Sequence, residues 1–305
     1  MIDEVRRECS RHGDHAMVVS VDILETVRQD LTELARRESL GDFQRHILGS
    51  IYVTEPPKTG FSAVSIVIVA APTPALARLH FTWKGQRTAV TLPAGYIDKE
   101  SAPQRVLRYL SRLLEPRGFH LVHEPRLPRK LLAARSGLAA YGRNNLCYVP
   151  GMGSFLTLST FFSDLPCMAA GAQELQVMDS CSGCSACQQR CPTGAIGGPR
   201  LLLDAERCLT FFNEAGGFPF PDWIPPDAHN SLYGCHRCQT ACPANQDRLR
   251  DVVEPAAFDE EETGVLLEGR ALDRLPPELC MRLASLNMTD YLPALPRNLR
   301  ALGIG

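Results

Sequence analysis

Residues 181–192 read CSGCSACQQRCP, and this stretch decides how the rest of the chain is interpreted. Its spacing is C-x2-C-x2-C-x3-C-P, the run that binds [4Fe–4S] clusters in bacterial iron–sulfur proteins. Cysteines three residues apart let one tight loop present thiolates to three iron corners, and the proline stops any regular continuation. A shorter copy follows, with cysteines at 235, 238 and 242 and a proline at 243. The two runs predict a pair of clusters and therefore electron transfer.

Counting ligands shows that the second cluster is one thiolate short. In proteins with two such runs, the fourth cysteine of each run ligates the other cluster. Cluster one is therefore expected to have the ligands Cys181, Cys184, Cys187 and Cys242. Cluster two is expected to have Cys191, Cys235 and Cys238. A complete second run would have a further cysteine at position 232, where the chain has Leu232.

The missing ligand must come from a cysteine outside the two runs. The candidates are Cys9, Cys147, Cys167, Cys208 and Cys280. We favour Cys208, because it lies between the runs in the stretch LDAERCLTFF, which we expect to be a short helix that directs one side chain inward.

Two other uses of the cysteines are weighed against iron–sulfur clusters. C-x2-C pairs also bind zinc, but zinc sites usually combine two separated pairs, whereas here four cysteines lie within eleven residues and end in Cys-Pro. A disulfide framework is less favoured, because 305 residues can build a core without crosslinks and no secretory segment is expected. The spacing therefore favours [4Fe–4S] clusters.

Length and composition are those of an ordinary globular enzyme with room for two domains, or for one domain with an inserted module. The chain has 305 residues, 45% of them hydrophobic and 22% charged, and a net charge of −2, so no general attraction to nucleic acid or anionic membranes is expected. The apolar run at 63–71 is too short to span a bilayer. Arg6 and Arg7 precede a polar stretch, which argues against a twin-arginine export signal. We expect a cytoplasmic protein.

Hydrophobic periodicity predicts an α+β fold, because helices and paired strands do not alternate strictly. Helices are expected at 2–12, 23–37, 102–114 and 129–141. Strands are expected at 17–21, 62–71 and 120–123, with a hairpin of 77–83 and 87–93, and 145–163 is expected to be mostly extended, with a break at 150–153. The acidic run 259–262 is taken as a solvated loop. The expected domains are a cofactor- and substrate-binding domain (1–177), a two-cluster ferredoxin-like module (178–248) and a helical tail (249–305) that packs back on the first domain.

Further segments, taken with the cysteine runs, carry a resemblance to a known family. They are SGLAAYGRNN (136–145), PGMGSFLTLSTFFSD (150–164), CPTGAI and LDAERC (191–208) and the closing LPRNLRALGI (295–304). The chain resembles the epoxyqueuosine reductase-like group, which is related to reductive dehalogenases and consists of cobalamin-dependent iron–sulfur reductases. The resemblance is clearest over the central part of the chain, from about residue 120 to 245.

This resemblance implies a fold and a reaction. The first domain would be nitroreductase-like or cobalamin-processing-like and would hold cobalamin beside the two-cluster module. An external donor of ferredoxin or flavodoxin type would reduce the clusters, which would pass electrons to the corrinoid and so to a small substrate. The resemblance also implies a cluster ligand between the two runs, which agrees with the choice of Cys208. The chain has no Asp-x-His-x-x-Gly motif, and its nearest string, 227–232, lacks the glycine, so the cobalamin is expected to be base-off.

The resemblance also assigns candidate site residues. The position of the family's proton donor falls on His123, so His123 or the adjacent Glu124 is the candidate general acid. Arg143 and Asn144 would contact the cofactor, and Gly151, Gly153 and Ser154 would form a loop close to it. The alternatives are that His123 only ends a strand, that 143–145 cap a helix, and that 150–154 form an ordinary turn.

Two further alternatives concern cofactor and partner. The first domain could hold a flavin instead of cobalamin, and the chain could be an electron-transfer or corrinoid-reactivating partner without a small substrate of its own. We do not expect tRNA as the substrate, because the chain lacks the helical-repeat extension of the tRNA-modifying members and has no basic surplus.

Overall fold

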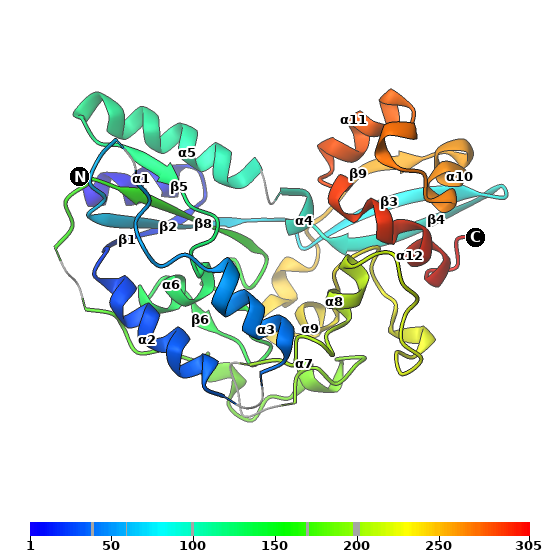
Figure 1. Cartoon of the computed structure of the whole chain (residues 1–305), viewed down its shortest axis with the longest axis horizontal. Helices are drawn as coiled ribbons and strands as arrows, with labels where there is room; N and C mark the ends of the chain where they lie inside the picture. Colours follow the sequence, from blue (N-terminus) through cyan, green and yellow to red (C-terminus); the bar gives the residue numbers. More distant parts are fainter. Residues whose placement is uncertain (38–39, 59, 99–100, 169–170, 198–201) are drawn as a thin grey trace. The chain divides into compact units, whose positions relative to one another are not determined.

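Two units make up the chain, and each contains two separate stretches of sequence. The computed structural model describes residues 1–37, 40–58, 60–98, 101–168, 171–197 and 202–305 (Figure 1). The first unit comprises 1–72 and 100–183, and the second comprises 73–99 and 184–305. Among the helices in these ranges, none has the length and apolar character needed to cross a bilayer.

An antiparallel sheet forms the centre of the first unit. Its strand order is β1 (His15–Ser20), β2 (Ser65–Pro72), β8 (Leu156–Ser163) and β5 (Leu121–His123). The side chains of β2 are buried from Ser65 to Ala71, which explains why this strand is a continuous apolar run instead of an alternating one. Ile68 of β2 lies opposite Met17 on one side and Thr160 on the other, and this register sets the face that each neighbour presents.

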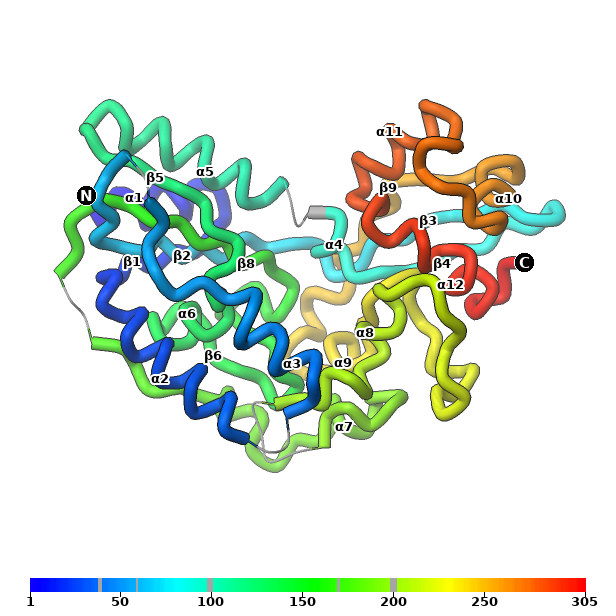
Figure 2. The backbone as a smooth tube through the Cα atoms, in the orientation of Figure 1, coloured from blue at the N-terminus to red at the C-terminus, as the bar shows by residue number. Residues whose placement is uncertain are grey.

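Helices cover both faces of this sheet (Figure 2). On one face, α1 (Ile2–Arg11) and α5 (Ser101–Leu114) pack apolar side chains such as Val5 and Leu110 against Val67 and Phe161 of the sheet. On the other face, α6 (Arg129–Arg135) contacts β2 and β8, and α2 (Ile23–Ala35) packs on α6. The predicted helices at 2–12, 23–37 and 102–114 are thus confirmed within two residues at each end.

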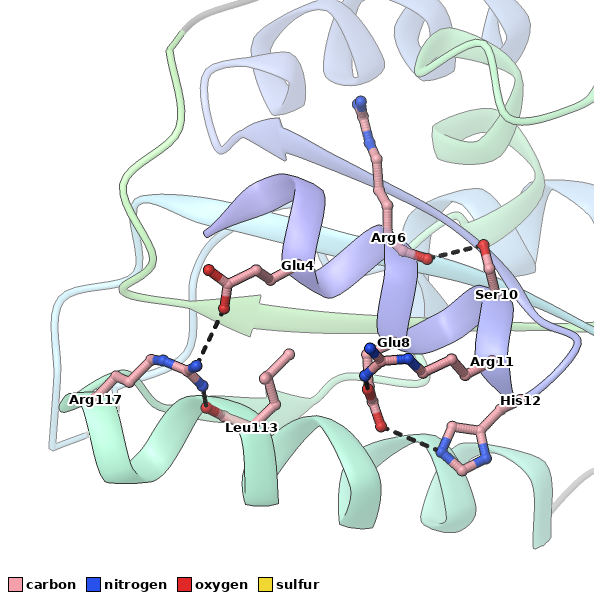
Figure 3. Close-up of polar contacts among 8 residues, drawn as sticks. All are labelled: Glu4, Arg6, Glu8, Ser10, Arg11, His12, Leu113 and Arg117. Atoms are coloured by element: carbon pink, nitrogen blue, oxygen red, sulfur yellow. Dashed lines mark hydrogen bonds and ion pairs between the residues drawn. The ribbon is translucent and has the colours of Figure 1, made fainter.

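Ion pairs on the surface accompany the packing of α1 near α5 (Figure 3). Arg117, just after α5, forms an ion pair with Glu4 at 3.2 Å and donates to the carbonyl oxygen of Leu113 at 2.6 Å. Glu8 of α1 pairs with Arg11 at 2.8 Å and lies 3.5 Å from His12. Exposed pairs of this kind contribute less than about 1 kcal/mol each, so the apolar face of α1 dominates its docking.

One predicted helix in this unit is too long. The helix expected at 129–141 ends at Arg135, because Gly137 adopts a left-handed φ of 75° that stops a helix. Residues Ala140–Tyr141 instead form the strand β6, which pairs with β7 (Cys147–Tyr148). The extended character predicted for 145–163, with its break at 150–153, is confirmed by β7, β8 and the turn between them.

A three-stranded sheet organises the second unit. The hairpin of β3 (Leu76–Trp83) and β4 (Gln86–Pro93) is confirmed, and its turn residues Lys84 and Gly85 both have positive φ, as a two-residue turn requires. The third strand, β9 (Val252–Phe258), pairs in parallel with β3 and was not predicted. It contains Pro255 and is partly exposed, so its sequence lacks the apolar pattern of a buried strand.

C-terminal helices pack on this sheet and form the second core. They are α10 (Glu260–Glu268), α11 (Pro277–Ser285) and α12 (Leu295–Ala301). The rings of Phe81 and Phe258 stack at 4.8 Å between centroids within this core. The acidic run is not a loop, because Asp259 caps α10 in a capping box with Glu262, and carboxylates at a helix N-terminus are favourable.

The observed units differ from the expected domain boundaries. The hairpin 76–93, which the sequence places in the 1–177 domain, groups with residues 184–305 because β9 adds to its edge and the C-terminal helices cover it. The tail therefore packs on the hairpin. The remaining short helices are α3 (Asp42–His46), α4 (Gly95–Asp98), α7 (Ala186–Gln189), α8 (Leu209–Glu214) and α9 (Arg237–Thr240).

Candidate iron–sulfur and cofactor site

Four cysteine thiols gather in the second unit as the ligand count requires. Burial raises the pKa of Cys208, Cys235 and Cys238, and neighbouring cysteines raise it further. Cys208 is close to Cys191, Cys235 is close to both, and Cys238 is close to all three. Four half-buried thiolates would repel one another, and cationic iron removes that repulsion when it binds them. This donor set fits a [4Fe–4S] cluster, and the assignment of Cys208 as its fourth ligand stays a prediction.

Members of the two predicted ligand sets are neighbours within this unit. Helix α7 carries Cys187 and contacts α9, which carries Cys238, and the pKa of Cys238 is also raised by Cys187. Within the described ranges, no three His, Cys, Asp or Glu side chains converge as the ligands of one metal ion do. A cube has a different requirement, because its four thiolates bind four separate irons around its surface.

The structure delivers Cys208 differently from the expected helix. Cys208 lies just before α8 with φ −68° and ψ 127°, which is an extended conformation. The preceding residues form a turn, in which the carboxylate of Asp204 accepts from the N–H of Arg207 and its carbonyl accepts from the N–H of Cys208. Leu209 then anchors α8 in an apolar cluster. The helix therefore starts one residue after the thiol that it positions.

The position at which the second run lacks its first cysteine is part of the core. Leu232 is fully buried in the apolar cluster of the second unit, and its N–H donates to the carbonyl oxygen of Thr91. A charged thiolate at this position would be buried among apolar side chains at high cost. The local fold thus explains why position 232 carries an apolar residue and not a ligand.

Arg143 is tied to a cluster cysteine. Its N–H lies 3.4 Å from the sulfur of Cys181, and its guanidinium donates to the carbonyl oxygen of Cys181 at 2.8 Å. Both residues belong to the first unit, because the boundary between the units falls between 183 and 184. Hydrogen bonds to cluster sulfurs help to set reduction potentials. The geometry therefore connects Arg143 with Cys181, a predicted ligand of cluster one, and the corrinoid contact of Arg143 stays a prediction.

Asn144 is used inside the turn that joins β6 and β7. It is 2% exposed, its Oδ1 accepts from the N–H of Leu146 at 3.3 Å, and its Nδ2 donates to the hydroxyl of Tyr148 at 3.0 Å. A Cβ on Gly142 would lie 2.4 Å from the Tyr148 ring, so this turn also needs glycine. The cofactor contact of Asn144 stays a prediction, whereas the alternative of a helix cap is wrong because α6 ends at Arg135.

The predicted glycine loop is a tight turn with open space beside it. Gly151 and Gly153 have φ of 78° and 60°, and the N–H groups of Met152 and Gly153 donate to the carbonyl of Val149. A Cβ added to Gly151 would meet no atom within 4 Å, so the backbone conformation demands glycine there. Ser154 follows and is buried. These residues leave the backbone accessible at Gly151, which is compatible with an adjacent cofactor.

His123 and Glu124 lie at the end of β5 in different environments. The ring of His123 is 5.3 Å from that of Phe161. The carboxylate of Glu124 accepts three hydrogen bonds from Arg126, at 3.0, 3.0 and 3.1 Å. These bonds lower the pKa of Glu124, while burial opposes them. Glu124 is therefore a carboxylate at neutral pH, and a proton-donating role can fall only to His123 within this pair.

The lowered pKa of Glu124 predicts an acid-side loss of stability. The Glu124–Arg126 pair stabilises the fold above the ordinary Glu pKa of 4.5 and loses that contribution as the pH falls through the lower folded value. Urea unfolding between pH 3 and pH 7 should show a smaller acid-side decrease in Glu124→Gln than in the unaltered protein. Glu115→Gln, at an exposed carboxylate, serves as the control. If the stability of Glu124→Gln fell as much on the acid side as that of the unaltered protein, the stabilising role of the Glu124–Arg126 pair would be contradicted.

Two polar residues in these regions had no predicted role. Lys130 of α6 donates to the carbonyl oxygen of Asn145 at 3.0 Å, and burial lowers the pKa of its ammonium group. Asn230 contacts the sulfur of Cys235. Sequence reasoning considered Asn230 only within the string 227–232, and the useful signal was its position five residues before a ligand.

Comparison with known proteins first gives the class of the cysteine-rich region. Residues 180–245 match the family described as the 4Fe-4S double cluster binding domain. The chain also resembles epoxyqueuosine reductases. It is 32% identical to that of Bacillus subtilis (strain 168) over 44% of this chain and 34% of the relative, and 30% identical to that of Escherichia coli (strain K12) over 47% and 41%. The chain thus spans between a third and a half of the length of these relatives.

Solved structures confirm the predicted α+β fold class. A crystal structure of selenomethionine-labelled epoxyqueuosine reductase matches 98% of this chain and 80% of its own, with a TM-score of 0.66 and 19% identity. A crystal structure of epoxyqueuosine reductase with a tRNA-Tyr stem loop matches with a TM-score of 0.61 and 19% identity. At these identities the likeness establishes the fold. The predicted resemblance to epoxyqueuosine reductases is confirmed.

Proposed function

We propose that this chain is an iron–sulfur reductase related to epoxyqueuosine reductase. Two [4Fe–4S] clusters would relay electrons from an external ferredoxin- or flavodoxin-type donor to a corrinoid in the first unit. The observation that carries the proposal is the gathering of Cys208 with Cys191, Cys235 and Cys238, because it supplies a full ligand set for the second cluster. The resemblance to named reductases gives the class of reaction.

The roles of the first-unit residues follow from their environments. The turn of Gly151, Gly153 and Ser154 would support the corrinoid, which supplies low-potential reducing chemistry when bound. Arg143 would act on cluster one through Cys181, and Asn144 would hold the turn beside it. His123 would donate the proton that accompanies reduction of the substrate, because its partner Glu124 is already ionised.

Identification of the bound cofactor tests this proposal. The protein is purified anaerobically, its clusters are reconstituted, and it is incubated separately with cobalamin and with flavin mononucleotide before gel filtration. Corrinoid absorption that co-elutes with the protein is the expected result. Flavin retention without corrinoid retention would establish the alternative of a flavin-containing reductase. If the protein retained neither cofactor but reduced a separate corrinoid protein, the alternative of an electron-transfer partner would be established.

His123→Phe should abolish turnover and leave the clusters and cofactor bound. Phenylalanine keeps the ring contact with Phe161 but has no ionisable proton to donate. The turnover rate should therefore fall by at least about 10²-fold if His123 is the general acid. Epoxyqueuosine, as the nucleoside and within a tRNA stem loop, is the substrate to test first, because the relatives are named for it. Glu124→Gln is the matched control and should retain most activity. Full activity in His123→Phe would reject the role.

A small substrate is proposed in place of tRNA, and binding measurements test this directly. The net charge of −2 offers no general attraction to a polyanion. A gel shift with the tRNA-Tyr stem loop at moderate salt should therefore show no complex. Tight binding that weakens steeply as salt rises would instead establish tRNA as the partner, as in the solved relative.

A further inference from the structure

Asn230 lies on the loop between the single turn Pro226–Ala228 and the ligand Cys235. Its Nδ2 donates to the carbonyl oxygen of Ala228 at 2.7 Å and lies 3.4 Å from the sulfur of Cys235. Its Oδ1 accepts from the N–H of His236 at 3.3 Å. All of these residues belong to the second unit. The side chain therefore bridges the two ends of the loop beside a cluster-two ligand.

These contacts fix which way round the amide lies. An N–H group can donate only to an acceptor, so the backbone N–H of His236 requires the oxygen of the amide on its side. The nitrogen then lies 2.7 Å from the carbonyl oxygen of Ala228 and 3.4 Å from the sulfur of Cys235. The same sulfur lies 3.7 Å from Oδ1, but once deprotonated it can only accept, so its hydrogen bond is with the nitrogen. Each N–H of the amide has one partner, and rotating the amide would place oxygen against both acceptors.

The backbone of Asn230 is held as firmly as its side chain. Its carbonyl oxygen accepts from the hydroxyl of Thr91 at 3.2 Å and lies 2.8 Å from Nε2 of His236. Thr91 belongs to β4, so the loop is attached to the rigid hairpin of the unit. An N–H group on such a support is preorganised toward the sulfur and needs no rearrangement when the charge of the sulfur changes.

A cluster-bound sulfur is a thiolate, which has no proton and can only accept hydrogen bonds. We propose that Asn230 sets the reduction potential of cluster two by donating its side-chain N–H to Cys235. Reduction adds negative charge to the cluster and its sulfurs, so the bond is stronger in the reduced state and raises the potential. This inference rests on the cluster part of the proposed function and is independent of the corrinoid.

Two substitutions remove the bond in different ways. Asn230→Leu removes all hydrogen bonds of the side chain at similar volume, whereas Asn230→Asp keeps the acceptor for His236 and loses both donors. Each should make reduction of cluster two less favourable by roughly tenfold, which corresponds to a midpoint potential about 59 mV lower for a one-electron couple. The added charge in Asn230→Asp should give the lower potential of the two.

Asn213→Leu is the matched control. The Asn213 amide is 1% exposed and donates to the carbonyl oxygen of Gly234 at 2.8 Å, so it supports the same loop without touching a sulfur. Asn213→Leu should leave the midpoint potential of cluster two equal, within experimental error, to that of the unaltered protein. An equal decrease in Asn213→Leu would show that loop support and not the N–H···S bond sets the potential, and would overturn the proposal.

The measurement is an anaerobic redox titration followed by electron paramagnetic resonance. The signal that is absent from Cys208→Ala identifies cluster two. A lower potential in the Asn230 variants but not in the control supports the proposal, and an unchanged potential overturns it. If a variant does not retain its cluster, the unaltered protein labelled with ¹⁵N-asparagine decides. Pulsed electron paramagnetic resonance spectra must then show a ¹⁵N coupling to the reduced cluster, and the absence of such a coupling would overturn the proposal. If the unaltered protein binds only one cluster, the proposed function itself fails.

Discussion

Cys208→Ala should leave the reconstituted protein with about four irons per chain in place of about eight. The thiol lies among Cys191, Cys235 and Cys238, and removing it takes one of four ligands from cluster two while leaving the predicted ligands of cluster one intact. Iron and sulfide analysis and the cluster absorption per chain measure the loss. The brown absorption should fall by about half.

A second cysteine in the same unit provides the control for this result. Cys280 of α11 is half-buried and donates to the carbonyl oxygen of Leu272, far along the sequence from both runs. Cys280→Ala should retain all eight irons. If Cys208→Ala also retained them, another residue would be the fourth ligand, and the ligand assignment would be wrong.

Arg297→Met should destabilise the second unit by about 3 kcal/mol. The guanidinium of Arg297 donates to the carbonyl oxygens of Phe212, Ala215 and Phe218 and lies 3.8 Å from the centroid of the Phe220 ring. Methionine keeps part of the volume but leaves these carbonyls without their donor and removes the cation–π contact. Urea unfolding, monitored by the cluster absorption, measures the effect.

The matched control for Arg297 is an exposed arginine of the same unit. Arg270 pairs with Glu268 on the surface at 2.6 Å, and Arg270→Met should cost little. Arg297 belongs to the closing segment 295–304. Its guanidinium donates to carbonyl oxygens within and just after α8, and so helps to position Cys208, which directly precedes α8. Similar urea midpoints of unfolding for Arg297→Met and Arg270→Met would contradict this role of the C-terminal segment.

Local chemistry explains what the sequence could predict. The spacing of the cysteine runs is itself the geometry of a ligand loop, so the predicted clusters needed no tertiary information. The strand β2 was recognisable because every position is apolar or small, and the hairpin because Lys84 and Gly85 suit its turn. Counting ligands predicted Cys208 as a partner of Cys191, Cys235 and Cys238, and Cys208 lies near these three cysteines, although the helix expected around it begins one residue later.

Long-range contacts explain what the sequence could not predict. Strand β9 exists because it pairs with β3, more than 170 residues earlier, and its own sequence is partly polar and contains Pro255. Nothing in the sequence indicated that Arg143 contacts Cys181 or that Asn144 closes a turn, and their predicted cofactor contacts stay predictions. Such differences depend on which partner the fold brings near, and this is not encoded in local residue type.

We propose that electrons pass through two clusters to a corrinoid bound by the same chain. Stopped-flow mixing of the dithionite-reduced, desalted protein with cobalamin, followed at cluster and corrinoid wavelengths, tests it most directly. We expect cluster absorption to recover at the same rate at which bound corrinoid is reduced, and Cys208→Ala to slow this transfer by at least tenfold. Clusters that stay reduced beside oxidised corrinoid in the unaltered protein would contradict the proposed electron path.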